Sequence, residues 1–207
     1  MIMPIATSSK RAAILAIAGR TFLRHGYANA SMDGIVAEAG GSKSTLYRYF
    51  PSKAALFAAF VEEVGTVTRA AFATVDVEGK DAKAVLEETA RAYLDLISTP
   101  SALAMTRLVM AEAGRFPEVG RIFYEHGIQR TERQIAAILK RLAERGDVPD
   151  RSGLARPGAA AQFRALCEAG PHEGCVWGLR ETVSQEEIAK IAHQAATHFL
   201  RGWTGQA

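Results

Sequence analysis

The stretch SMDGIVAEAGGSKSTLYRYFPSK, residues 31–53, places two short apolar-periodic segments on either side of a double glycine. Ser31 and Ser42 stand where helix N-caps belong, because a serine oxygen accepts hydrogen bonds from the free N–H groups of a first helical turn. The glycines supply the left-handed backbone that ends a helix, and Pro51 disfavours helix in the residue before it. The pattern predicts a helix, a glycine turn and a second helix, which together form a helix-turn-helix.

The second of these helices carries a cluster of polar and charged side chains. Leu46 and Phe50 lie four residues apart on one face and are predicted to enter a small core. The remaining faces hold Lys43, Ser44, Thr45, Tyr47 and Arg48. Because the second helix of this motif enters the major groove of DNA, these donors are candidates for contacts with bases and phosphates. Periodicity alone also fits an ordinary solvated helix face.

Helical spacing continues along nearly the whole chain, and alternating strand patterns are scarce. A first helix is expected to begin near Ser8 or Ser9 and to end at Gly26, and the helix that starts at Ser52 is expected to reach residue 75. Further helices are expected near 81–98, 101–114, 117–145, 157–168, 172–181 and 184–202. The predicted fold is all-α, with an N-terminal three-helix domain that contains the helix-turn-helix and a C-terminal helical bundle.

Positive charge is concentrated at the start of the chain. Residues 1–53 contain seven lysines and arginines and two acids, a net charge of +5, whereas the remaining residues carry a net charge of −2. A basic head on a near-neutral body suggests that the head meets a polyanion. No signal-peptide pattern opens the chain, and its apolar runs are shorter than the roughly 20 residues that span a bilayer. We expect a cytoplasmic protein.

Four motifs follow one another without a gap in residues 14–63: HGY after the first helix, then SMDGIVAEAG, TLYRYF and SKAAL. Together they resemble the N-terminal domain of the TetR family of transcriptional regulators. The resemblance implies a DNA-binding domain over residues 1–53, a ligand-binding and dimerisation domain over residues 54–207, and a helix over 52–75 that links them. It implies a homodimeric repressor that leaves a palindromic double-stranded DNA operator when a small apolar or aromatic effector binds.

The resemblance also places the family's DNA contacts on particular residues. Ser31 and Lys53 would contact phosphates, Lys43, Ser44 and Thr45 would approach bases, and Tyr47 and Tyr49 would lie along the DNA backbone. Ser42 and Arg48 complete the predicted DNA-binding set. Gly41 and Ser44 depart from the family, which has a small apolar residue and a glycine or alanine there, so the operator sequence is not transferable from relatives.

The predicted effector pocket lies in the C-terminal bundle, where the stretch RLVMAEAGRFPEVGRIFYEHG resembles the AcrR-like branch of the family. A pocket of this kind is lined by apolar and aromatic side chains with a few polar anchors. The candidates are Tyr93, Met105, Leu108, Met110, Phe116, Phe123 and Trp177, with Arg107 as an anchor for an anionic ligand. The alternative is that these side chains only fill the core.

The last two long helices are expected to form the dimer interface, as the resemblance implies. Apolar residues at helical spacing on them are Phe163, Leu166, Ile188, Ile191, Ala195 and Phe199. The alternative is packing within one chain.

The sequence CEAGPHEGC brings Cys167, His172 and Cys175 close together, which leaves a metal or thiol sensor open as an alternative. Free cysteine more commonly behaves as a small buried hydrophobe, so we predict no metal site and no cofactor. We find no paired nucleophile and base and no phosphate-binding glycine loop, and therefore predict no catalytic site. The competing functions are an enzyme acting on a small apolar molecule and a nucleoid-type DNA binder without sequence preference.

Overall fold

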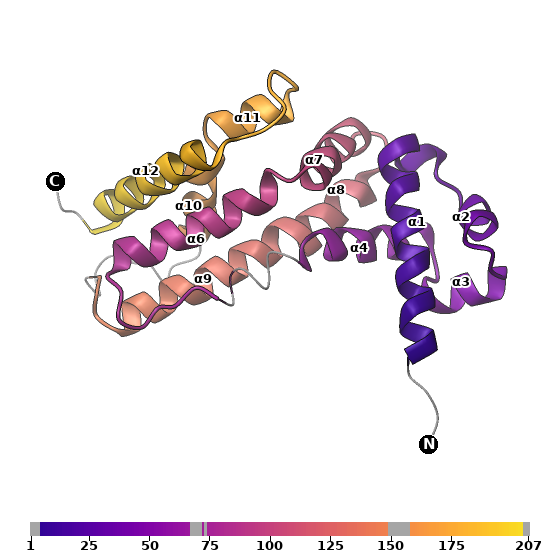
Figure 1. Cartoon of the computed structure of the whole chain (residues 1–207), viewed down its shortest axis with the longest axis horizontal. Coiled ribbons are helices and arrows are strands. Elements are labelled where there is room, and N and C mark those ends of the chain that lie inside the picture. Colours follow the sequence, from indigo (N-terminus) through magenta and orange to yellow (C-terminus); the bar gives the residue numbers. More distant parts are fainter. Residues whose placement is uncertain (1–4, 67–71, 73, 149–157, 205–207) are drawn as a thin grey trace. The chain divides into compact units, whose positions relative to one another are not determined.

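The computed structural model describes residues 5–66, 72, 74–148 and 158–204, and the regular elements among them are all helices (Figure 1). The first four are α1 (Ile5–Asn29), α2 (Met32–Ala39), α3 (Lys43–Tyr49) and α4 (Lys53–Val64). They are followed by α6 (Ala82–Ile97), α7 (Pro100–Glu112), α8 (Pro117–Phe123), a π-helical turn (Tyr124–Ile128), α9 (Gln129–Glu144), α10 (Ala159–Glu168), α11 (Pro171–Val176) and α12 (Gln185–Thr204). The all-α prediction is confirmed. No helix of the described segments is long and apolar enough to cross a membrane.

Several helices differ from the predicted ones. The first begins at Ile5 rather than near Ser8 or Ser9, and it runs to Asn29 through a kink at Gly26, whose φ is 78°. The predicted helix 52–75 is wrong at its end, because α4 ends at Val64 and residues 74–77 are not helical. Residues 67–71 and 73 of that prediction lie outside the described residues. The predicted helix 117–145 contains a π-helical turn, and the helix predicted at 172–181 ends at Val176, shortly before Gly178 takes φ 74°.

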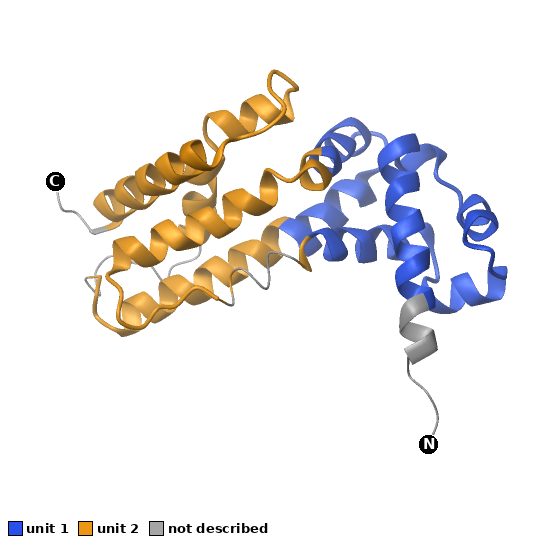
Figure 2. Ribbon diagram, viewed as in Figure 1, with its two compact units in different colours: residues 1–64, 104–127 blue, residues 65–103, 128–207 orange. Residues whose placement is uncertain are grey.

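The chain divides into two compact units, coloured separately in Figure 2. Unit 1 comprises residues 1–64 and 104–127, and unit 2 comprises residues 65–103 and 128–207. Unit 1 is thus larger than the predicted DNA-binding domain, because α4 packs on α8 and the apolar core of the first helices includes Met105, Leu108, Val109 and Val119.

The core of unit 1 buries one stripe of each early helix. Leu46 of α3 and Phe50 at its end are 1% and 2% exposed, as their spacing predicted. Helices α1, α2 and α4 also contribute fully buried side chains to this core. These are Ala18, Phe22, Ile35, Leu56 and Phe57. Burying a large apolar side chain contributes about 1.5–3 kcal/mol, so these stripes supply the stabilisation that the short helices α2 and α3 lack by themselves.

The turn between α1 and α2 is held from several sides within unit 1. The ring of Tyr27 lies 5.3 Å from that of Phe57 and 5.6 Å from that of Phe116, measured between centroids. Burial raises the pKa of Tyr27 to about 12, and the Glu118 carboxylate adds to the rise. The Ala28 N–H donates to the Glu112 carboxylate at 3.2 Å. The end of α1 is therefore fastened to α4, α7 and α8.

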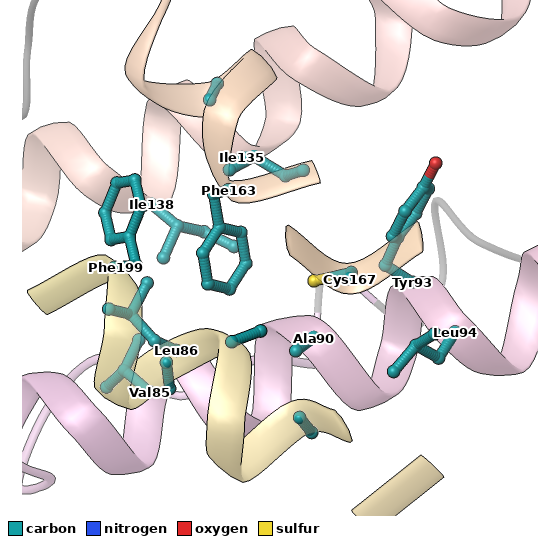
Figure 3. Packing of buried hydrophobic residues seen from close by; sticks show 14 of the residues in the cluster. Val85, Leu86, Ala90, Tyr93, Leu94, Ile135, Ile138, Phe163, Cys167 and Phe199 are labelled. Atoms are coloured by element: carbon teal, nitrogen blue, oxygen red, sulfur yellow. The ribbon is translucent and has the colours of Figure 1, made fainter. Parts of the chain in front are cut away.

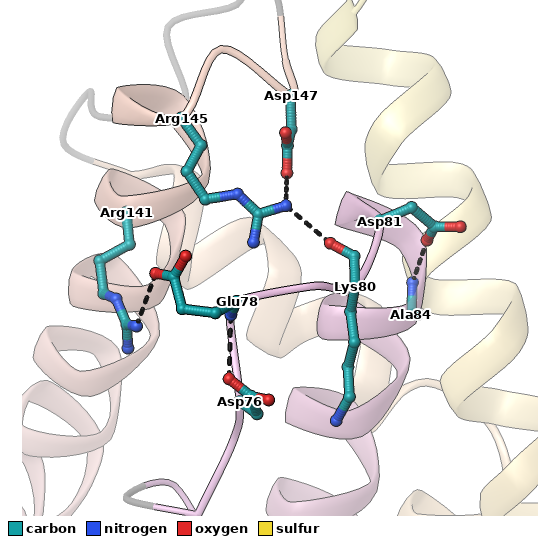
Figure 4. A network of polar contacts seen from close by, with 8 residues as sticks. All are labelled: Asp76, Glu78, Lys80, Asp81, Ala84, Arg141, Arg145 and Asp147. Carbon is teal, nitrogen blue, oxygen red and sulfur yellow. Dashed lines mark hydrogen bonds and ion pairs between the residues drawn. The ribbon is translucent and has the colours of Figure 1, made fainter.

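The core of unit 2 is formed by α6, α9, α10 and α12 (Figure 3). α12 lies along α6, and the rings of Phe163 and Phe199 meet edge to face with centroids 5.1 Å apart. At the end of α9, Arg145 donates to the Lys80 carbonyl at 2.6 Å and pairs with Asp147, while Arg141 reaches Glu78 at 3.5 Å (Figure 4). These contacts hold the loop before α6 against α9.

The double glycine between α2 and α3 contains one glycine that the backbone requires and one that it does not. Gly40 caps α2 with φ 60°, a left-handed conformation. A Cβ at Gly41 would come no nearer than 3.8 Å to Lys10 Cε, an ordinary contact. We predict that Gly40→Ala destabilises the protein by about 1–2 kcal/mol and that Gly41→Ala is neutral or stabilises by up to about 1 kcal/mol. Urea unfolding measures both, and equal losses in the two variants would contradict this difference.

Candidate nucleic-acid interface and buried polar cluster

Helix α3 presents its polar residues on the sides that the core leaves open. Lys43, Ser44, Tyr47 and Arg48 are exposed, with Tyr47 46% exposed, and Thr45 is half-buried. Tyr49 is half-buried against the core of unit 1, and the guanidinium of Arg48 lies 5.2 Å from its ring centroid. A short helix with this division of faces is able to offer hydrogen-bond donors to a groove while Leu46 and Phe50 hold it to the protein.

Three serines cap helices in this region: Ser31 and Ser42 of the predicted DNA-binding set, and Ser52 beside Lys53. Ser31 Oγ accepts from Gly34 N at 3.0 Å at the start of α2, and Ser52 Oγ accepts from Ala55 N at 3.1 Å at the start of α4. Ser42 Oγ accepts from Thr45 N at 3.2 Å at the start of α3. These caps use the side-chain oxygens, and the N-terminal ends of the helices remain positive ends of helix dipoles.

Ser42 also organises the first turn of α3. Its hydroxyl lies 3.0 Å from that of Ser44 and 2.9 Å from that of Thr45, within hydrogen-bond distance of both. The departure from the family at Ser44 therefore adds a hydroxyl that is tied to the helix cap. A linked set of hydroxyls is pre-oriented, so less side-chain freedom is lost when it binds any partner.

Lys53 holds the turn between α1 and α2. Its ammonium donates to the carbonyls of Tyr27, Ala28 and Ala30 at 2.8, 3.3 and 3.1 Å, and lies 4.5 Å from the Tyr27 ring centroid. An ammonium has three N–H donors, so three carbonyls occupy all of them in this conformation. We interpret Lys53 as a positioning residue, and its contact with phosphate stays a prediction.

The two acidic residues of the basic N-terminal segment, residues 1–53, both lie on α2. Each forms an ion pair with a lysine or arginine of a neighbouring helix. Lys43 Nζ is 2.8 Å from Asp33 Oδ2, with the two side chains 65% and 64% exposed. Arg20 of α1 is 3.0 Å from Glu38, with 65% and 52% exposed. The hydrogen bond to Asp33 and its charge raise the pKa of Lys43.

Two further cations of α1 lie beside α3 and were absent from the predicted set. The Arg11 guanidinium stands 5.1 Å from the Phe50 ring centroid, and Lys10 lies near Gly41 before α3. Both are exposed. Their charge was visible in the sequence, but helical spacing in α1 alone gives no distance to α3.

The residues predicted to line the effector pocket are divided between the two units. Tyr93 and Trp177 belong to unit 2 and the others to unit 1. Met110 and Trp177 are 58% and 65% exposed, Arg107 is exposed, and Phe116 and Phe123 pack against the core of unit 1. Met105 and Leu108 lie in that core. The exposed positions of Met110 and Trp177 do not fit the lining of an enclosed pocket.

A half-buried polar cluster adjoins the buried Tyr93 in unit 2. The Tyr93 hydroxyl donates to the Glu168 carboxylate, which also accepts from Arg164 Nη1 at 2.6 Å. Figure 3 shows the Tyr93 ring near Cys167. Arg164 Nε donates to Glu132 at 3.0 Å. Burial and the nearby Glu168 carboxylate raise the pKa of Tyr93 well above its ordinary value, so the phenol is protonated at neutral pH. One cation between two carboxylates leaves this cluster with a net negative charge.

Cys167, His172 and Cys175 are all buried in unit 2. Burial raises the pKa of Cys167 to about 12, which leaves a thiol rather than a thiolate at neutral pH. Burial lowers the pKa of His172, and its Nδ1 has no hydrogen-bond partner. Across the described ranges, no three or more His, Cys, Asp or Glu residues are grouped so as to hold a metal ion.

Five of the six residues predicted for the dimer interface are buried inside the chain's own core. They are Phe163, Ile188, Ile191, Ala195 and Phe199, none more than 7% exposed. Helical periodicity finds buried stripes but does not distinguish what buries them, and α6 and α10 cover much of α12. Leu166 is half-buried, and it lines an open groove of about 650 Å³ between α10 and α12. The other lining residues are Gln162, Ala165, Ala169, His198, Phe199, Gly202 and Trp203.

Two family models together match most of the chain. Residues 14–60 match the model of bacterial regulatory proteins of the tetR family, and residues 84–204 match the C-terminal domain of AefR-like transcriptional repressors. An uncharacterised HTH-type transcriptional regulator of Mycobacterium tuberculosis is 27% identical over 154 residues, which cover 70% of this chain and 68% of its own length.

Solved structures share the whole fold. The flavonoid-responsive regulator FrrA is 30% identical, with a TM-score of 0.76 over 97% of this chain and all of its own. A TetR-family transcriptional regulator from Mesorhizobium loti is 26% identical, with a TM-score of 0.76 over 94% of this chain and 96% of its own.

The contacts of Lys53 predict an effect on stability. Lys53→Met removes the donors of three carbonyls at the α1–α2 turn, so we expect a loss of about 1–3 kcal/mol. The control is Lys10→Met, which removes an exposed lysine of α1 and should change stability little. Urea unfolding of both variants measures the difference. A Lys53→Met variant that is as stable as the control but has lost DNA affinity would instead support the phosphate contact.

Proposed function

The chain belongs to the TetR family of bacterial regulatory proteins, and we propose that it is a homodimeric repressor that leaves a palindromic operator when a small effector binds. Its relatives are transcriptional regulators, so the chain is a DNA-binding regulator and not an enzyme. The division of α3 into a buried Leu46–Phe50 stripe and exposed donors is the observation that carries the DNA-binding proposal. We propose a cytoplasmic location, where such a regulator meets DNA.

The proposed DNA surface is centred on α3. Lys43, Ser44 and Thr45 approach bases, because the first turn of the second helix meets base edges in this motif. Tyr47, Arg48 and Tyr49 lie along the DNA backbone, together with Ser31, Ser42 and Lys53 at the starts of α2, α3 and α4. Lys10 and Arg11 join this surface, since both lie beside α3. Residues 1–53 supply all of these contacts.

We assign effector binding and dimerisation to residues 54–207. FrrA is named for its response to flavonoids, which supports an aromatic effector here. Among the predicted lining residues, Tyr93 has the strongest support, because its hydroxyl ends in a polar cluster of the kind that orients a ligand. The net negative charge of that cluster favours a neutral ligand with hydroxyl donors over an anionic one.

The effector would act by shifting a conformational equilibrium. A ligand that prefers a conformation with misplaced recognition helices weakens operator binding by its difference in affinity for the two conformations. Within unit 1, α7 and α8 contact the α1–α2 turn through Glu112 and Phe116, and His126 of the π-helical turn lies 2.9 Å from Glu62 of α4. Movement of these helices would reach the α1–α2 turn through direct contacts, and would reach the recognition helix α3 through α2, which packs on it.

The dimer surface that we propose is the groove between α10 and α12. A twofold dimer reads two half-sites about 34–36 Å apart or a multiple of that spacing. Ala165, Ala169 and Gly202 are exposed and small, so a second copy can approach the helix backbones closely. Leu166 and Trp203 add half-buried apolar surface.

The first test of the proposed function is selection of bound sequences from random DNA, followed by affinity measurements on the selected duplex and a scrambled one. We expect a palindrome, and Thr45→Ala should lower the operator-to-scrambled affinity ratio by about 5- to 150-fold, as for loss of one base contact. Adding a flavonoid such as naringenin should release the operator. Enrichment of no sequence would indicate the nucleoid-type alternative.

The second test concerns the dimer. Ala165→Arg places a long charged side chain in the α10–α12 groove, so we expect a shift from dimer to monomer in sedimentation velocity and a loss of operator affinity. Met110→Arg adds the same side chain at an exposed site of unit 1 and should leave the dimer intact. A dimer that persists in the Ala165→Arg variant would place the interface elsewhere.

A further inference from the structure

The ion pair between α2 and α3 bears directly on how a base-reading lysine avoids phosphates. Lys43 is the first residue of α3, and its ammonium already donates to Asp33 of α2 at 2.8 Å. Both side chains are well exposed, so the pair lies at the protein surface rather than in the core. We propose that Asp33 is a specificity-determining residue that directs Lys43 toward neutral base acceptors and away from phosphates; this proposal rests on the proposed DNA-binding function.

The geometry sets the preference through charge. An ammonium has three N–H donors, and Asp33 takes one, which leaves two for DNA. A phosphate that accepts a hydrogen bond from one of these two N–H groups lies close to the Asp33 carboxylate. Because both groups are negatively charged, they repel each other. The major-groove acceptors of guanine, N7 and O6, are uncharged and meet no such repulsion.

The pair therefore weakens non-specific binding more than operator binding. Non-specific binding comes almost entirely from phosphate contacts, whereas discrimination comes from base edges. A lysine without a carboxylate partner binds phosphate on any sequence. A lysine held by Asp33 contributes mainly where a base acceptor lies within its reach.

The same helix supplies a matched control. Glu38 also lies on α2 and also forms an ion pair, at 3.0 Å, with the exposed side chain of an arginine. Glu38→Gln changes the carboxylate to an amide, with the same change of net charge as Asp33→Asn. Its partner Arg20 lies on α1 and is outside the proposed base-reading set. Comparing Asp33→Asn with Glu38→Gln separates the effect of the Lys43 contact from the effect of one added unit of net positive charge.

The experiment measures binding of the full-length protein to the selected operator and to a scrambled duplex of equal length, by fluorescence anisotropy over a series of NaCl concentrations. Asp33→Asn should tighten binding to the scrambled duplex and lower the operator-to-scrambled affinity ratio by about threefold or more. On the scrambled duplex, the slope of log affinity against log salt concentration should become steeper by about 0.9, as for one added phosphate contact. Glu38→Gln should leave the ratio unchanged. Asp33→Glu, which keeps the carboxylate, should restore most of it.

A double-mutant cycle with Lys43→Met decides whether the lysine mediates the effect. In the Lys43→Met background, Asp33→Asn should no longer change the ratio. Equal effects of Asp33→Asn and Glu38→Gln on the ratio, or an Asp33→Asn effect that persists without Lys43, would overturn the proposal. A wild-type protein that binds both duplexes equally would instead refute the proposed function. Thermal unfolding of each variant identifies any loss of fold, because Asp33 also lies in the first turn of α2.

Discussion

The turn between α1 and α2 is the junction on which the DNA-binding surface depends. Lys53 binds three of its carbonyls, Glu112 accepts its Ala28 N–H, and the Tyr27 ring fills the space between α4 and α8. A turn whose backbone groups are satisfied by side chains from two other helices cannot move without breaking several contacts at once. This junction therefore helps to position α2, on which α3 packs.

Helix α3 has little intrinsic stability, since a helix of seven residues is far below the length that is stable alone in water. Its geometry comes from the Ser42 cap and from Leu46 and Phe50 in the core. The first turn therefore has fixed side-chain directions before DNA arrives. The contact between Asp33 and Lys43 gives an exposed charged side chain of the same turn a partner as well.

The faces of the helices were predictable from the sequence because helical periodicity reports burial directly. The partners were not, because they lie far apart in the chain: Lys53 reaches back to Tyr27, and Glu112 reaches Ala28. The dimer residues show the same limit. The stripe that includes Ile188 was correctly recognised as buried, but its burial comes from the chain itself rather than from a second copy.

An effector can act on the operator only by as much as it distinguishes two conformations of the protein. Unit 1 contains both the recognition helix and parts of α7 and α8, so the contacts of Glu112 and Phe116 join them within one packed core. Packed cores respond to displacement by changing between discrete arrangements rather than by gradual deformation. A shift of α7 that removes Glu112 would leave the Ala28 N–H without its acceptor and loosen the turn that Lys53 holds.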